Sequence, residues 1–219
     1  MDILFFGKKG DRNTEIAANY TKQIFPNAII ILGNRGDKFP NDEISLWRGD
    51  YILSYLSPWI IPEDLLNRAT KGAINWHPGS PSYPGIGCTN FAIYNDEKDF
   101  GMTCHYMNKT VDTGSIIETR MFNILENDTV LSITEKCYAL ILTSYYSIIE
   151  KIYNHTIIEP SNLKWTRKPY TRKELDELCI ITNKMGKKEI EKRIKATTYD
   201  KPWAYTEING IKFYYNNLS

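Results

Sequence analysis

Short apolar runs alternate with helical patterns over the first third of the chain. Each run is followed within two residues by glycine or proline, which is typical of strands buried on both faces. The runs occupy residues 3–6, 28–32, 51–56 and 72–76. Stretches of helical character lie between them, over residues 13–25, 42–47 and 62–69. Strands that alternate with helices predict a parallel sheet with helices on both faces.

The middle of the chain carries two more strand patterns and one long helix. The strands, at residues 101–107 and 114–122, are too close in sequence for a helical crossover, so we expect them to pair antiparallel. Residues 128–153 read as one helix, with Ser132 and Glu135 in the spacing of a capping box. Its apolar residues recur at helical spacing and predict a core stripe without a cofactor role: Val130, Ile133, Cys137, Leu140, Ile141, Tyr145, Ile148 and Ile152.

The composition changes after residues 159–162. Two shorter helices are expected near residues 171–179 and 187–196, and Asn209-Gly210 predicts a tight hairpin over residues 204–215. The predicted class is therefore α/β, a Rossmann-like, mostly parallel sheet with a small C-terminal region of helices and a β-hairpin. The expected division is a catalytic domain over residues 1–158 and a C-terminal unit over residues 159–219.

Composition narrows the class of protein. Hydrophobic residues make up 42% and charged residues 24% of the chain, as in soluble globular proteins. A net charge of +1 gives no support for a nucleic-acid partner. Four dispersed cysteines without a CxxC pair favour reduced thiols, and neither a signal peptide nor an apolar run of membrane-spanning length is evident. We therefore expect a cytoplasmic protein with no membrane partner.

Asn75 and His77 lie two residues apart at the end of a predicted strand. Strand alternation places both side chains on one face, and ligands of open α/β sheets bind beyond the carboxyl ends of the strands. An amide can donate to a developing oxyanion, and an imidazole can exchange a proton near neutral pH. Prolines at 78, 81 and 84 stiffen the following loop. The alternative, a strand-end histidine beside an ordinary turn, is about equally compatible with this motif alone.

Two further segments could complete a site. Asp112 occupies a turn ended by Gly114, although turn aspartates often bind only their own backbone. The strand that runs into Ser57 and two nearby prolines could line a flat pocket or form a buried connection. His105 is expected in the core or in a supporting role. No metal site is expected, because the histidines are isolated and HExxH is absent.

These segments together resemble a known family. "SYLSPWIIP", "INWHPGSPSYPGIGCTNFAIYN" and "GMTCHYMNKTVDTGSII" occur in the order and spacing of the folate-dependent formyltransferases. The resemblance covers about the first 150 residues. The family's Asn-x-His and Asp-x-Gly elements fall on Asn75, His77, Asp112 and Gly114. The second segment and the C-terminal part look most like the sugar N-formyltransferase branch.

The resemblance implies an enzyme whose formyl donor is N10-formyltetrahydrofolate and whose acceptor is a nucleotide-linked amino sugar. The expected acceptor is a dTDP-linked 3- or 4-amino-dideoxyhexose used in surface polysaccharide (O-antigen) synthesis, although the sequence fixes neither the nucleotide nor the amine position. The expected catalytic residues are Asn75, His77 and Asp112. The expected cofactor contacts are Ser57, Trp59, Ile60, Ile61, Val111 and Gly114. The expected acceptor contacts are Tyr83, Pro84, Gly85 and Asn90.

Alternatives remain at this point. Formyl transfer to an amine needs a base, an oxyanion donor and an orienting group. Either His77 or Asp112 could take the proton. The acceptor could be another amine, as in the methionyl-tRNA or glycinamide ribonucleotide branches, or the chain could be a silent folate- or nucleotide-binding module. The hairpin predicts a homodimer, since a lone hairpin is marginally stable, or else a monomer in which the hairpin packs on the preceding helices.

Overall fold

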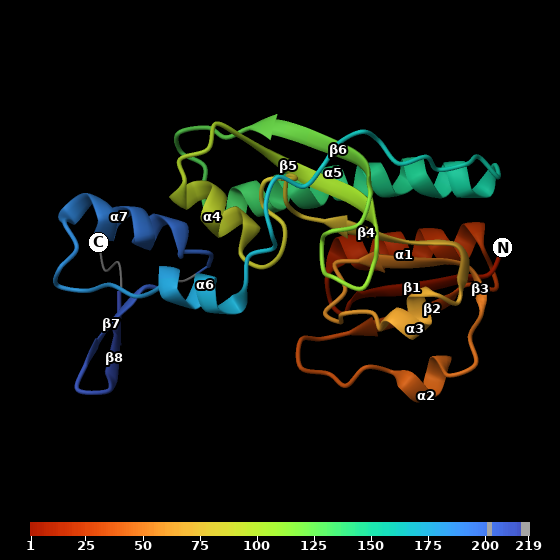
Figure 1. Ribbon diagram of the computed structural model, residues 1–219, viewed down its shortest axis with the longest axis horizontal. Helices are drawn as coiled ribbons and strands as arrows, with labels where there is room; N and C mark the ends of the chain where they lie inside the picture. Colours follow the sequence, from red (N-terminus) through yellow and green to blue (C-terminus); the bar gives the residue numbers. More distant parts are fainter. Residues whose placement is uncertain (201–202, 216–219) are drawn as a thin grey trace.

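The computed structural model describes residues 1–200 and 203–215 (Figure 1). A six-stranded sheet has the order β2-β1-β3-β4-β5-β6. Neighbours among the first four strands are parallel. Strand β5 pairs antiparallel with β6, as expected, and also with β4, a pairing that the sequence did not predict. The strands are β1 (Ile3–Lys8), β2 (Ile29–Gly33), β3 (Gly49–Tyr55), β4 (Ala69–His77), β5 (Asp99–Tyr106) and β6 (Ile116–Asn123).

Side-chain alternation along β1 divides the core between the two faces of the sheet. Phe5 packs on one face, against α1 (Arg12–Ile24) and the long helix α5 (Val130–Tyr153). Leu4 and Phe6 pack on the other face, which the short helices α2 (Asn41–Ile44) and α3 (Glu63–Leu66) cover. The predicted α/β class with helices on both faces is confirmed. Helix α3 is shorter than expected because β4 already begins at Ala69, where it pairs with β3.

The long helix has the predicted core stripe and lies within the predicted range of residues 128–153, but it has a different N-cap. Thr129 is the N-cap, and its side chain and that of Ser132 each accept a hydrogen bond from the other's backbone N–H. The expectation of a capping box from Ser132 and Glu135 is therefore wrong. Asp128 supports the cap at Thr129, because its carboxylate accepts from the Ser132 hydroxyl and from Lys136. The cap thus lies about one turn before the predicted one.

The C-terminal elements pack at one end of the molecule (Figure 1). Helices α6 (Arg172–Leu178) and α7 (Lys187–Ala196) share a core with α4 (Cys88–Tyr94) and the start of α5. Strands β7 (Tyr205–Ile208) and β8 (Ile211–Tyr214) form the predicted hairpin. Its turn residues Asn209 and Gly210 have φ values of 51° and 80°, as a type I′ turn requires.

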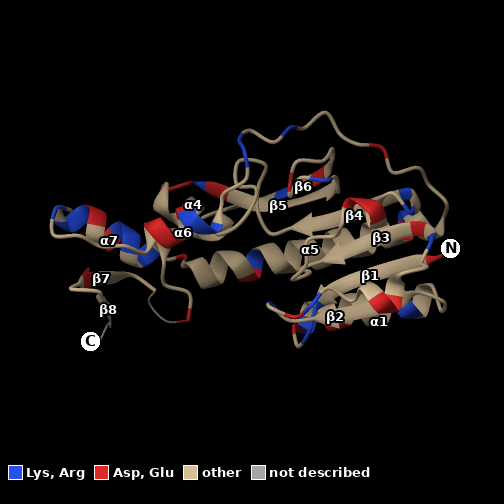
Figure 2. Cartoon of the chain, turned by 60° about the horizontal axis from the view of Figure 1, so that its bottom comes forward, with Lys and Arg blue, Asp and Glu red and all other residues tan. Residues whose placement is uncertain are grey.

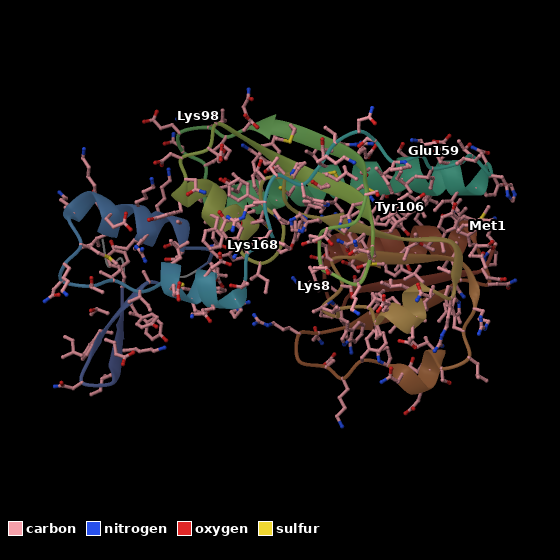
Figure 3. The ribbon with its side chains drawn as sticks, in the orientation of Figure 1. Met1, Lys8, Lys98, Tyr106, Glu159 and Lys168 are labelled. Carbon is pink, nitrogen blue, oxygen red and sulfur yellow. The ribbon has the colours of Figure 1, made fainter. Side chains whose placement is uncertain are left out.

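Residues 159–171, here called the strap, connect α5 to α6 across the sheet. Figure 3 labels Glu159 and Lys168 near its two ends. The backbone N–H of Ser161 donates to Ile116 of β6, and that of Thr166 donates to Pro81. Tyr170 forms a parallel bridge with Gly85. The strap therefore lies against the loop that follows β4.

Charged residues of both signs occur together on helices such as α6 and α7, whereas the strands of the sheet are mostly uncharged (Figure 2). This agrees with the net charge of +1. Within residues 1–200 and 203–215, no helix combines the length and apolarity that a membrane span requires.

Candidate active site

Asn75 and His77 lie at the carboxyl end of β4, where the register places Asn75 opposite His105 of β5. His77 is buried, with 4% of its surface exposed. Its Nε2 is 2.8 Å from the Tyr83 carbonyl, and its Nδ1 is 3.1 Å from Asp112 Oδ2. The carbonyl can only accept a hydrogen bond, so Nε2 carries a proton. The loop after β4 thus supplies the backbone carbonyl that orients the His77 imidazole.

Asp112 joins three segments at this point. Its Oδ2 accepts the Gly85 N–H at 2.8 Å, and its Oδ1 is 3.2 Å from His105 Nε2. Its φ of 47° is left-handed, a conformation that aspartate tolerates better than most residues. Burial by itself raises the pKa of Asp112, but His77, His105 and the Gly85 N–H together lower it to about 2. Asp112 is therefore an anion held between two imidazoles.

His105 has a larger part in the site than sequence reasoning assigned. Its Nδ1 donates to its neighbour's carbonyl, Tyr106 O, at 2.8 Å. Its Nε2 lies 3.1 Å from Asn75 Nδ2 as well as beside Asp112. Nε2 can donate to Asp112 when it carries a proton, or accept from the Asn75 amide when it does not, but not both at once. Strand alternation allowed this position, but only the register of β4 against β5 places His105 opposite Asn75.

A cavity of about 470 Å³ opens onto these groups. Asn75, His77, His105 and Asp112 all line it. Five of the expected cofactor contacts also line it: Ser57, Trp59, Ile60, Ile61 and Val111. The expected residues thus converge on one concave site with an apolar wall.

Trp59 is fixed in that wall by its surroundings. Its indole Nε1 donates to the Asp37 carbonyl at 3.0 Å, and its ring packs edge-on against Phe6 and Phe39. The ring also lies over Gly33, where an added Cβ would come within 2.2 Å of it. These contacts from β1, β2 and the loop after β2 fix the indole in the wall.

Several other expected contacts lie away from the cavity. Among the acceptor residues, Gly85 lines the cavity, whereas the described positions of Tyr83, Pro84 and Asn90 lie outside its lining. The Tyr83 hydroxyl donates to Glu97, and the Asn90 amide donates to Ala196 at the end of α7. Gly114 also lies outside the lining, and an added Cβ at this position would collide with the Tyr106 carbonyl oxygen.

Comparison with known proteins places the chain in a family. The model of the family described as "Formyl transferase" matches residues 36–145, half of the chain. The protein belongs to this formyl transferase family. A GDP-perosamine N-formyltransferase of Brucella melitensis is 28% identical over 167 residues, which are 75% of this chain and 63% of that protein. The chain thus spans less than two thirds of this curated relative.

Solved structures share the fold at low sequence identity. A sugar N-formyltransferase from Shewanella sp has a TM-score of 0.77 and 19% identity, covering 98% of this chain and 96% of its own. An N-formyltransferase from Helicobacter canadensis, solved with folinic acid and dTDP-3-aminofucose, has a TM-score of 0.72 and 18% identity, covering 97% and 86%. These likenesses establish the architecture of the described chain.

Proposed function

We propose that this protein transfers the formyl group of N10-formyltetrahydrofolate to the amine of a nucleotide-linked amino sugar. The observation that carries the proposal is the convergence of Asn75, His77 and Asp112 on one cavity in a member of the formyl transferase family. The names of the Brucella relative and of the Helicobacter neighbour support an amino-sugar acceptor.

The cavity fits the formyl donor. A pterin is flat and carries amide-like donors and acceptors, which suit backbone groups beside apolar walls. Trp59, Ile61 and Val111 supply such walls, and the cavity volume of about 470 Å³ is within the range of small-molecule sites. When bound, the donor supplies an activated formyl carbon. The residues of this chain that would hold it are those of the loop after β3 and of the segment before Asp112.

The polar groups are arranged to stabilise negative charge on the formyl oxygen. Asn75 can donate its amide N–H to that oxygen. His77 faces two acceptors, the Tyr83 carbonyl and the Asp112 carboxylate, and both hydrogen bonds form only when both ring nitrogens carry protons. In that doubly protonated form His77 contributes positive charge to the site, because neither ring nitrogen keeps a free lone pair.

Asp112 holds that charge in place. A carboxylate with a pKa of about 2 is a weak base, so it is poorly suited to take a proton from an amine. It is well suited to orient and balance the His77 imidazolium.

The attacking amine must be neutral, and the proton that it loses is needed on the leaving nitrogen of the donor. The net transfer then neither consumes nor releases a proton.

The expected acceptor is a dTDP-linked 3- or 4-amino-dideoxyhexose destined for a surface polysaccharide. Incubation with the formyl donor and a panel of dTDP-, UDP- and GDP-linked amino sugars tests this, with tetrahydrofolate release followed by absorbance. We expect release with a dTDP sugar. Release with GDP-perosamine alone would move the assignment to the chemistry named for the Brucella relative. No release with any sugar, but release with another amine, would refute the sugar acceptor.

We also propose a homodimer formed through the hairpin. One hairpin face carries Ile208, Ile211 and Phe213, whose side chains are 57%, 60% and 52% exposed in the single chain. Apolar side chains exposed together in this way mark an interaction surface. A second copy of the same hairpin would cover them through a two-fold axis.

A further inference from the structure

Trp165 of the strap contacts both imidazoles of the site. The indole centroid is 5.1 Å from that of His105 and 5.9 Å from that of His77, and both contacts are edge-to-face. The indole Nε1 donates to the Gly114 carbonyl at 2.8 Å. One side chain therefore touches the two rings and also the turn that presents Asp112.

The indole approaches the rings from outside the cavity. His77, His105 and Asp112 line the cavity, while Trp165, which is half-buried, is outside the set of described residues that line it. An apolar ring in this position excludes water from the two imidazoles on the side that faces away from the cavity. Low access to water strengthens the hydrogen bonds of a charged group.

The backbone of the strap fixes the indole. Ser161 N–H donates to Ile116 at 2.7 Å, and the residue after Trp165, Thr166, donates to Pro81 at 3.1 Å. Further along, Tyr170 N–H donates to Pro84 at 2.8 Å. These bonds attach the strap to β6 and to the loop after β4. The position of Trp165 is therefore set by the same segments that hold the histidines.

We propose that Trp165 is a positioning residue for formyl transfer, which shields the His77 and His105 rings from water and holds the Asp112 turn through Gly114. This inference rests on the proposed function for its role in the reaction. It extends the catalytic unit beyond residue 158, since Trp165 comes from the strap. Residues 1–158 alone would lack the indole that covers the His77 and His105 rings.

The histidine content allows a test that does not depend on activity. The chain has three histidines, and His155 is exposed after α5, so it serves as an internal reference. In protein labelled with 15N-histidine, we expect NMR to show imidazole N–H protons of His77 and His105 that exchange slowly with water. Trp165→Ala should broaden or remove both signals, whereas Trp165→Phe, which keeps a ring, should retain them.

Kinetics with the acceptor identified by the panel supply the second readout. Misplacement of reacting groups by about 1 Å can cost on the order of 100-fold in rate. We expect Trp165→Ala to lower kcat by about 10-fold to 100-fold with KM for both substrates changed less than about threefold, and Trp165→Phe to restore most of kcat. Leu163→Ala, on the same strap and 46% exposed in the wild type, is the matched control and should leave both readouts unchanged.

The outcomes separate the two claims. Slowly exchanging imidazole protons and unchanged kcat in Trp165→Ala would overturn the positioning role. The positioning role would also be overturned if Trp165→Phe, or the control Leu163→Ala, lost the imidazole signals and kcat to the same extent as Trp165→Ala. If the wild-type protein transfers formyl to no sugar, the proposed function fails, and the imidazole signals of the three variants still decide whether Trp165 shields the histidines.

Discussion

Asp112 is the residue whose environment departs most from that of an ordinary carboxylate. It is buried, has a left-handed backbone and lies between His77 and His105. The sequence showed an aspartate followed by Thr-Gly, a pattern that an ordinary turn could also produce. Only the resemblance to a family distinguished a site aspartate from an ordinary turn aspartate. The energetic consequence of its environment can be measured without any substrate.

Asp112 should make the free energy of unfolding fall as the pH is lowered into the acid range. Its pKa is lowered from 3.8 to about 2 in the folded state, so it stabilises the fold above pH 3.8, and this contribution is lost as the pH falls through about 2. The full contribution is about 2 kcal/mol. Asp112→Asn should remove it.

Urea unfolding at several pH values between about 5 and 2 checks this expectation, because the variant should show a shallower decline than the wild type. Asp176→Asn, on α6, is a control on an exposed carboxylate for which we expect the wild-type slope. Equal slopes for wild type and Asp112→Asn would show that Asp112 does not have the depressed pKa.

At the scale of elements, the sequence predicted which segments are strands and helices better than where they begin. Apolar runs and turn residues identified all six sheet strands and the hairpin. The N-cap of α5 was misassigned because Thr129, Ser132 and Glu135 offer overlapping capping patterns, and only the contacts of Asp128 favour Thr129. Pairing register, which sets His105 opposite Asn75, involves residues far apart in sequence and has no local signal.

The end of β2 should control the cofactor wall through Gly33. An added Cβ at Gly33 meets the Trp59 ring at 2.2 Å, so Gly33→Ala must displace the indole. We expect KM for the formyl donor to rise by about 10-fold, a loss of about 1.4 kcal/mol in binding, while KM for the sugar changes little. Initial-rate kinetics measure both constants. Gly186→Ala, where an added Cβ meets no atom within 4 Å, is the control. A donor KM equal to that of the wild type would remove Trp59 from the proposed wall.

The hairpin gives a second prediction at this scale. If its apolar face pairs with a second copy, a charge at its centre should separate the subunits, because an unpaired charge in an interface is costly. We expect Phe213→Asp to convert a dimer into a monomer in light scattering at micromolar concentration. Glu207→Ala lies on the opposite hairpin face and should remain dimeric. A monomeric wild-type protein would exclude the proposed dimer.

At the scale of the whole molecule, the site depends on parts that are distant in sequence. The sheet brings Asn75 and His77 to its carboxyl edge, β5 adds His105, and the following turn adds Asp112. The strap then adds Trp165 from beyond the expected domain boundary. Asn75, His77 and Asp112 follow from strand alternation and from the family's motifs, whereas the position of His105 depends on the register of β5 against β4. Trp165 could not be predicted in this way, because the strap has neither periodicity nor a motif, and its position depends on backbone bonds to β6 and to the loop after β4.

The central claim is that formyl transfer to a sugar amine takes place at Asn75, His77 and Asp112. Its most direct test uses a donor with a 13C-labelled formyl group, the sugar-nucleotide panel, and NMR to detect the label as a formamide on the sugar. Wild-type protein should form this product. His77→Ala should form it about 100-fold more slowly or worse while remaining folded at the assay temperature. Transfer by His77→Ala at the wild-type rate, or no labelled sugar from the wild-type protein, would contradict the account.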